Sequence, residues 1–145
     1  MQFKTIHNIV ATNKRKKDWG IEQSDICSFC NDIDTLDHAL WDCTFTQTVL
    51  IKCLSMLNLT LPDIQKHNFI LGYNDLSKDN VLLIIKNYLL YLRLNGKKYN
   101  ATQFVKEIEI HWLTDTKYMR HDVLDIKWSS IQHLKRNEIW TNMLT

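Results

Sequence analysis

The spacing of cysteines is the feature of this sequence that most restricts its fold. Three of the four cysteines and one histidine lie in the stretch "CSFCNDIDTLDHALWDC", with the pattern Cys-x2-Cys-x7-His-x4-Cys. Three thiolates and one imidazole are a complete tetrahedral ligand set for Zn²⁺, and they leave no position for water. We therefore predict one structural zinc ion, without Lewis-acid catalysis, bound by Cys27, Cys30, His38 and Cys43.

Two other interpretations of this cluster stay open. The cysteines could be buried thiols beside a surface histidine, or Cys27 and Cys30 could form a redox dithiol, although no βαβ pattern surrounds them. The fourth cysteine, Cys53, lies on the apolar face of a predicted helix and is expected in the core. Bound zinc would contribute about 10 kcal/mol or more, as in small finger peptides, and would order a loop that is poor in apolar residues.

The scarcity of turn-forming residues indicates a helical fold. The 145 residues include three glycines and one proline, too few for the turns of a β-sandwich or barrel. We predict a mostly α protein in which a small CCHC zinc module lies between an N-terminal helix and a bundle of about four helices. Residues 1–58 would form the basic helix and the zinc module, and residues 59–145 the helical C-terminal part.

Helical periodicity locates the first elements. Residues 3–12 predict a helix that "NKRKKDWG" ends, with Gly20 as its C-cap, and residues 21–34 predict an irregular loop. Asp34 is expected to cap the next helix, over "TLDHALW". Cys43 is five residues beyond His38 and so about 140° away on an ideal helix. We therefore expect this helix to end before Cys43, which lets the chain fold back.

The later elements are predicted by their apolar faces. A helix over 45–58 has a face built from Val49, Leu50, Cys53, Leu54 and Leu57. A connector over 59–77 precedes a helix over 80–94, which Ser77 or Asp79 would cap, and another helix covers 101–113. The stretch 115–143 is amphipathic, but its helical periodicity is weak. Its candidate buried stripe consists of Leu124, Trp128, Ile131 and Leu134.

Charge is segregated along the chain. Residues 1–20 carry five basic residues and one aspartate, whereas residues 21–45 carry six carboxylates and no lysine or arginine. Phosphate contacts are therefore expected from the basic run before the cysteines rather than from the zinc loop. The candidate nucleic-acid contacts are Lys14, Arg15, Lys16, Lys17 and, by stacking on a base, Trp19. The alternative for the basic run is a solvated helix end, where cations suit the helix dipole. Phe29 and Trp41, beside the ligands, are expected in the core.

No segment suits a signal peptide or a membrane span. The most apolar stretch, residues 81–94, is interrupted by Lys86, Asn87 and Arg93, and it is shorter than the roughly 20 residues that a bilayer requires. We expect an intracellular protein, cytoplasmic or nuclear, with reduced thiols and no membrane partner.

The surroundings of the cluster carry a family resemblance. "IVATNKRKKDWGIEQSDICSFCNDIDTLDHALWDC" resembles the zinc-binding region that follows the polymerase in non-LTR (LINE-type) retrotransposon reverse transcriptases. The matching positions are Thr12-Asn13, Gly20-Ile21, Ser24, Cys27, Cys30, Thr35, His38 and Cys43, with Asp34 in place of the usual glutamate. The close match covers roughly residues 9–50. The chain departs from the family at Thr44, where proline is common, and at Val49 and Leu50, where a tryptophan often occurs.

This resemblance implies a function that the chain would serve without catalysing a reaction. In the family, the region is implicated in holding template RNA or target DNA during target-primed reverse transcription. The chain has no Tyr/Phe-x-Asp-Asp signature of a polymerase palm, so we expect no enzymatic activity from it. The expected partners are RNA or DNA and the polymerase portion of the parent protein. The alternatives are a zinc-stapled interaction or scaffolding domain that docks on that polymerase, or an inactive fragment of an element.

Overall fold

The computed structural model describes residues 10–60 and 63–131, and this part of the chain is mostly helical. Its strand-like pairing is limited to an isolated antiparallel bridge between Ile26 and Ile33. The elements in chain order are α2 (Asn13–Asp18), η1 (His38–Asp42), α3 (Thr44–Met56), α4 (Lys66–Leu71), α5 (Leu76–Leu94), α6 (Ala101–Tyr118), α7 (His121–Lys127) and η3 (Ser129–Ile131). The predicted mostly α fold, with the cysteine and histidine cluster between helices, is confirmed.

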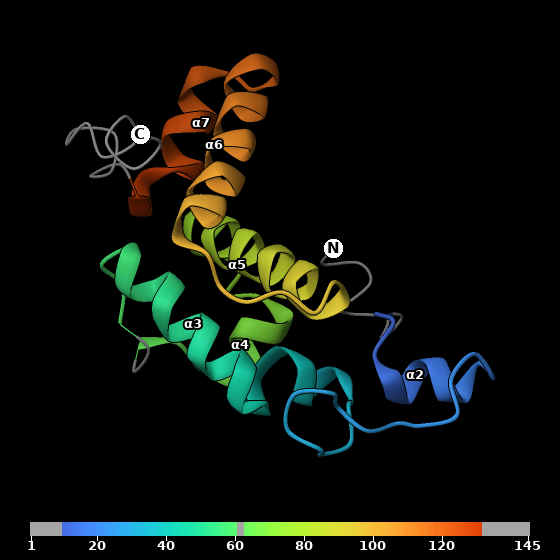
Figure 1. Ribbon diagram of the computed structural model, residues 1–145. Coiled ribbons are helices and arrows are strands. Elements are labelled where there is room, and N and C mark those ends of the chain that lie inside the picture. Colours follow the sequence, from blue (N-terminus) through green and yellow to red (C-terminus); the bar gives the residue numbers. More distant parts are fainter. Residues whose placement is uncertain (1–9, 61–62, 132–145) are drawn as a thin grey trace.

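Helix α5 is the centre of the molecule. It packs against α3, α6, α7, η1 and η3. Figure 1 shows α6 and α7 rising as a pair from one end of α5, while α2 lies near the other end. The core around α5 includes the fully buried side chains of Phe69, Tyr88, Leu89, Phe104 and Trp128. Burial of large apolar side chains is the main favourable term in folding, so α5 organises the stability of this part.

The predicted apolar faces are confirmed where they fall on described residues. The predicted face residues Val49, Leu50, Cys53 and Leu54 are buried in α3, and so are Leu57, just beyond its end, and Leu124, Trp128 and Ile131. Leu134 lies outside the described residues. The thiol of Cys53 is fully buried in the core, as expected, and burial raises its pKa to about 12.

Three predicted boundaries are wrong. Helix α5 begins at Leu76, because the carboxylate of Asp75 accepts a hydrogen bond from the backbone N–H of Lys78 at 2.9 Å and caps the helix in place of Ser77 or Asp79. The connector over 59–77 contains α4. The stretch from 115 is divided, because α6 continues to Tyr118 before α7 begins.

The basic run forms a helix instead of ending one. Helix α2 consists of "NKRKKD", and the hydroxyl of Thr12 accepts from the N–H of Arg15 at its start. Gly20 lies just beyond its end with a φ of 75°. Residues 3–9 of the predicted first helix lie outside the described residues. In the part of the chain that is described, no helix combines the length and the apolarity needed to cross a membrane.

Candidate metal centre and the basic helix beside it

Cys27 and Cys30 lie on a tight hairpin. The Cys27 N–H donates to Asp32 O at 2.7 Å, the Asp34 N–H donates to Asp25 O at 2.7 Å, and the Asn31 N–H donates to Cys27 O at 3.1 Å. Asn31 has a φ of 65°, which asparagine tolerates better than most residues do. These backbone bonds hold the two thiols on one side of the hairpin with few apolar contacts.

His38 begins the turn η1, and Cys43 follows its last residue. Its residues form a π-helical turn, in which the Cys43 N–H donates to His38 O at 2.9 Å, five residues back. The turn ends at Asp42, as predicted, and Cys43 has an extended backbone. This return of the chain lets Cys43 join His38 in the cluster, as expected, although the turn is π-helical rather than α-helical. A π turn is wider, so residues five apart come nearly into line.

The predicted N-cap of this turn is also wrong. The hydroxyl of Thr35 accepts a hydrogen bond from the His38 N–H at 3.2 Å. The carboxylate of Asp34 points instead to α2, where it accepts from the Asn13 N–H at 2.8 Å. Asp34 therefore caps the basic helix that precedes it in the sequence, twenty-one residues away.

The structure brings all four predicted ligands together. Their donor atoms lie within 4.8 Å of one another, and Cys27, His38 and Cys43 are buried. The Sγ of Cys43 lies 3.8 Å from the Sγ of Cys27 and 3.7 Å from that of Cys30. A tetrahedron with metal–sulfur bonds of about 2.3 Å has edges of about 3.8 Å. The four side chains can thus hold one metal ion, and their geometry is compatible with a structural zinc.

The electrostatics of the cluster favour thiolates at two of the cysteines. Burial by itself would raise the pKa of Cys27, but hydrogen bonds from the Phe29 N–H and the Arg93 guanidinium bring that pKa below its usual value. Burial and the adjacent thiols of Cys43 and Cys27 raise the pKa of Cys30 to about 11. A metal ion at the cluster would deprotonate the thiol of Cys30, because a metal ion deprotonates the thiol that coordinates it.

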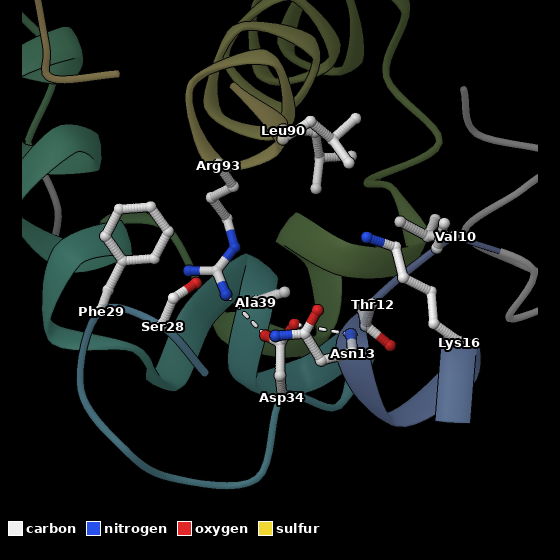
Figure 2. A pocket seen from close by; sticks show the side chains of 12 residues that line it. Val10, Thr12, Asn13, Lys16, Ser28, Phe29, Asp34, Ala39, Leu90 and Arg93 are labelled. Atoms are coloured by element: carbon white, nitrogen blue, oxygen red, sulfur yellow. Dashed lines mark hydrogen bonds and ion pairs between the residues drawn. The ribbon is translucent and has the colours of Figure 1, made fainter. Parts of the chain in front are cut away.

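Arg93 is the functional residue that sequence reasoning missed. It is the last basic residue of α5, and its guanidinium donates to Asp34 at 2.5 Å and to Cys27 Sγ at 3.4 Å. Both side chains of the Arg93–Asp34 pair are only 8% exposed. Figure 2 shows the guanidinium pointing from α5 to Asp34, which in turn meets Asn13 at the start of α2. An arginine inside an apolar helix was the available signal, but its partner could not be read from the sequence.

The predicted nucleic-acid contacts all lie on or next to α2. Lys14 pairs with Asp18, and Lys17 Nζ lies 3.4 Å from Asp25 Oδ2, both in exposed positions. The guanidinium of Arg15 lies 5.6 Å from the centre of the Trp19 ring. Trp19 is 46% exposed, whereas most aromatic side chains of the described residues belong to the core or pack against it.

Of the two aromatic residues beside the ligands, Trp41 packs against the core as predicted, whereas Phe29 is half-buried and lies outside the core cluster. Phe29 stacks on Phe45 with a centroid distance of 4.1 Å, and the Arg93 guanidinium lies 5.2 Å from the Phe29 ring. Trp41 packs at 5.4 Å from Phe69. These contacts leave Trp19 as the aromatic side chain of this region that is open to solvent.

Searches of protein-family models, of curated proteins and of solved structures find no match to this chain.

Proposed function

We propose that this chain is a zinc-stabilised nucleic-acid-binding accessory domain, of the kind that the resemblance to non-LTR retrotransposon reverse transcriptases implies. The observation that carries the proposal is the position of Asp34. Its carboxylate joins the start of the basic helix α2 to the loop that carries the metal ligands. A structural metal would thus fix the position of a cationic helix, which could not bury enough apolar surface to hold itself.

The proposed metal is zinc. Three sulfur ligands and one imidazole are the softer donors that zinc accepts and that magnesium and calcium avoid. The four protein ligands complete a tetrahedron, so the ion would be structural rather than catalytic. The chelation experiment in the Discussion tests this part of the proposal.

The proposed ligand is template RNA or target DNA, bound through the cations of α2. The ion pairs of Lys14 and Lys17 with Asp18 and Asp25 lie in exposed positions. Such pairs contribute at most about 1 kcal/mol, so phosphate groups can replace the carboxylates at little cost. Trp19, at the end of the same helix, would stack on an unpaired base. The remainder of the chain would dock on the polymerase portion of the parent protein.

Removal of the α2 cations tests the proposal. We expect that replacing Lys14, Arg15, Lys16 and Lys17 with alanine lowers RNA affinity and flattens its salt dependence, because each phosphate contact adds about 0.7 to the slope for single strands. Fluorescence anisotropy at several salt concentrations measures both. The matched control replaces three lysines and one arginine that are exposed elsewhere, namely Lys78, Lys106, Lys117 and Arg120. Equal effects of the two variants would contradict the proposal.

A second candidate is the interaction or scaffolding domain. Ile110 and Leu113 are exposed on α6 and Ile126 is exposed on α7, which favours a partner at that end of the molecule. Helix α5, by contrast, buries its apolar residues within the chain and leaves few for docking. RNA binding that neither variant changes, or that is absent, would favour this candidate over nucleic-acid binding.

A further inference from the structure

A cavity of about 320 Å³ lies between α2, the hairpin and the C-terminal end of α5. Figure 2 shows its walls. Leu90, on α5, lies on one side, and the polar side chains of Asn13 and Lys16 come from α2 on the other. The cavity has the volume of a small ligand site, which typically begins at about 300 Å³. It is separate from the four metal ligands, none of which lines it.

Two charged residues of the cavity are already used by the fold. Arg93 and Asp34 pair with each other, and both hold neighbouring elements in place. The side-chain amide of Asn13 donates to Ile26 O at 2.7 Å, and this bond leaves the oxygen of the amide as an acceptor. These groups shape the wall of the cavity, but they do not supply a net charge to it.

Lys16 differs from its neighbours on α2. Its side chain extends into the cavity, between Val10 and Leu90 in Figure 2. Lys14 and Lys17 pair with carboxylates outside it, whereas within residues 10–60 and 63–131 the Lys16 ammonium has neither an ion pair nor a hydrogen bond. An ammonium group donates up to three hydrogen bonds, so Lys16 offers an unused cation to an anion that enters the cavity.

The combination of one cation with an apolar wall indicates the class of ligand. The aliphatic side chains of Leu90 and Leu94 can contact the flat face of a base, and the ammonium of Lys16 can contact its phosphate. A base that is paired in a duplex cannot leave its partner to enter such a space without losing its pairing and stacking. We propose that this cavity holds a single unpaired nucleotide of the bound strand. The inference rests on the proposed nucleic-acid binding and adds a preference for single strands.

The preference for single strands tests the inference. The metal-loaded full chain would be titrated with a fluorescent 12-nucleotide RNA and with the blunt duplex of the same sequence. We expect the wild type to prefer the single strand by about tenfold, the range expected for contacts to one base. Lys16→Met should abolish this preference. Lys17→Met removes the same charge from the same helix, but it should weaken the binding of both RNAs while the preference stays.

A second pair of variants keeps the test independent of α2. Leu94 lines the cavity and is exposed, so that Leu94→Asp places a carboxylate at the site without removing core packing. Its control is Leu113→Asp, at an exposed position of α6. We expect Leu94→Asp to reduce the preference for single strands and Leu113→Asp to keep it.

The outcomes separate this inference from the proposed function. If both RNAs bind but Lys16→Met and Lys17→Met act alike, or if the wild type has no preference, the cavity is not a nucleotide site and the proposed function stands. If the wild type binds neither the RNAs nor the DNAs of the same sequence, the proposed function and the nucleotide site both fail.

Discussion

Two regions of this molecule are held together by different forces. The metal module, residues 19–43, leaves Ile21 and Ile33 exposed, and its buried side chains include three of the four metal ligands. The helical body, α3 to α7, buries large apolar side chains around α5. Backbone hydrogen bonds and a metal ion would order the hairpin of the first region, whereas apolar burial orders the second region and the turn η1, whose Leu40 lies in the core. Because different interactions order the two regions, we expect them to unfold under different conditions.

A buried ion pair joins the two regions, in addition to the packing of η1 against α3 and α5. Arg93 belongs to the body and Asp34 belongs to the module, and both are nearly inaccessible to solvent. Arg93 also approaches Thr46 Oγ1 at 3.4 Å, at the start of α3. Removal of the metal should therefore destabilise the hairpin much more than the helical body. Breaking the ion pair between Arg93 and Asp34 should affect both regions.

Metal removal should produce the largest effect. With about 10 kcal/mol or more of metal binding lost, we expect the hairpin to open while the helical body keeps its helicity. Hydrogen exchange monitors both regions, since the Cys27 and Asp34 N–H groups should become exposed to exchange while the amides of α5 stay protected. Circular dichroism measures the remaining helix content.

Two cysteine variants provide the matched comparison. Cys43→Ser removes a ligand and should reproduce the effect of the chelator. Cys53→Ser changes a buried cysteine of the core, so it should lower the stability of the body but leave the affinity for zinc unchanged. Unaltered exchange in the hairpin after chelation would show that the module does not depend on a metal.

Breaking the ion pair should produce the next largest effect. Arg93→Leu leaves the buried carboxylate of Asp34 without its cation, and we expect a loss of about 3–5 kcal/mol in the free energy of unfolding. Chemical denaturation measures the loss. We also expect zinc affinity to fall about tenfold or more, because the guanidinium contacts the Cys27 thiolate.

An exposed pair is the control for the buried one. Lys66 Nζ lies 2.8 Å from Asp42 Oδ2 at the surface of the turn η1, and Lys66→Met should cost less than about 1 kcal/mol. In addition, the double variant Arg93→Leu/Asp34→Asn should cost less than the sum of its single changes, because it leaves no unpaired charge. Strict additivity would mean that the pair does not couple the two regions.

Lys86 should produce a smaller, pH-dependent effect in the helical body. Burial among the core side chains lowers the pKa of this lysine to about 8, although Asp79 acts in the opposite direction. Between pH 8 and 10.5 the unfolded chain binds more protons at this residue than the folded chain, so the contribution of Lys86 to stability rises with pH. We expect Lys86→Met to gain stability relative to wild type below pH 8.

The relative stability of the two proteins checks this prediction. The advantage of Lys86→Met should shrink by about 3 kcal/mol as the pH rises from 8 to 10.5. Raised tyrosine pKa values, such as those of Tyr88 and Tyr99, affect both proteins and cancel in the difference. Lys78→Met, at an exposed position of α5, should give a curve parallel to that of wild type. A constant difference between Lys86→Met and wild type would contradict the prediction.

Much of the helical body could be predicted because its signals are local. An apolar face repeats at helical spacing over Val49, Leu50, Cys53, Leu54 and Leu57, and all five are buried, the first four in α3 and the last just beyond its end. The cluster of Cys27, Cys30, His38 and Cys43 could also be predicted, since chemistry and spacing identify these residues without knowledge of the fold.

What could not be predicted depends on contacts between distant residues. Asp34 matches the pattern of an N-cap for the residues after it, yet it caps α2 because the hairpin carries it back to Asn13. The π turn at His38 has no sequence signature that separates it from an ordinary helical turn. Arg93 is fifty-nine residues from Asp34, and no local pattern relates them.

The ion pair between Arg93 and Asp34 also forms late during synthesis of the chain. During synthesis, the fourth metal ligand, Cys43, is made fifty residues before Arg93. At about 5–20 residues per second, several seconds separate the two on the ribosome. In that interval the cysteines could bind a metal ion while the carboxylate of Asp34 still has no guanidinium partner. A metal ion bound in that interval would hold residues 27–43 together before the helical body exists to support them.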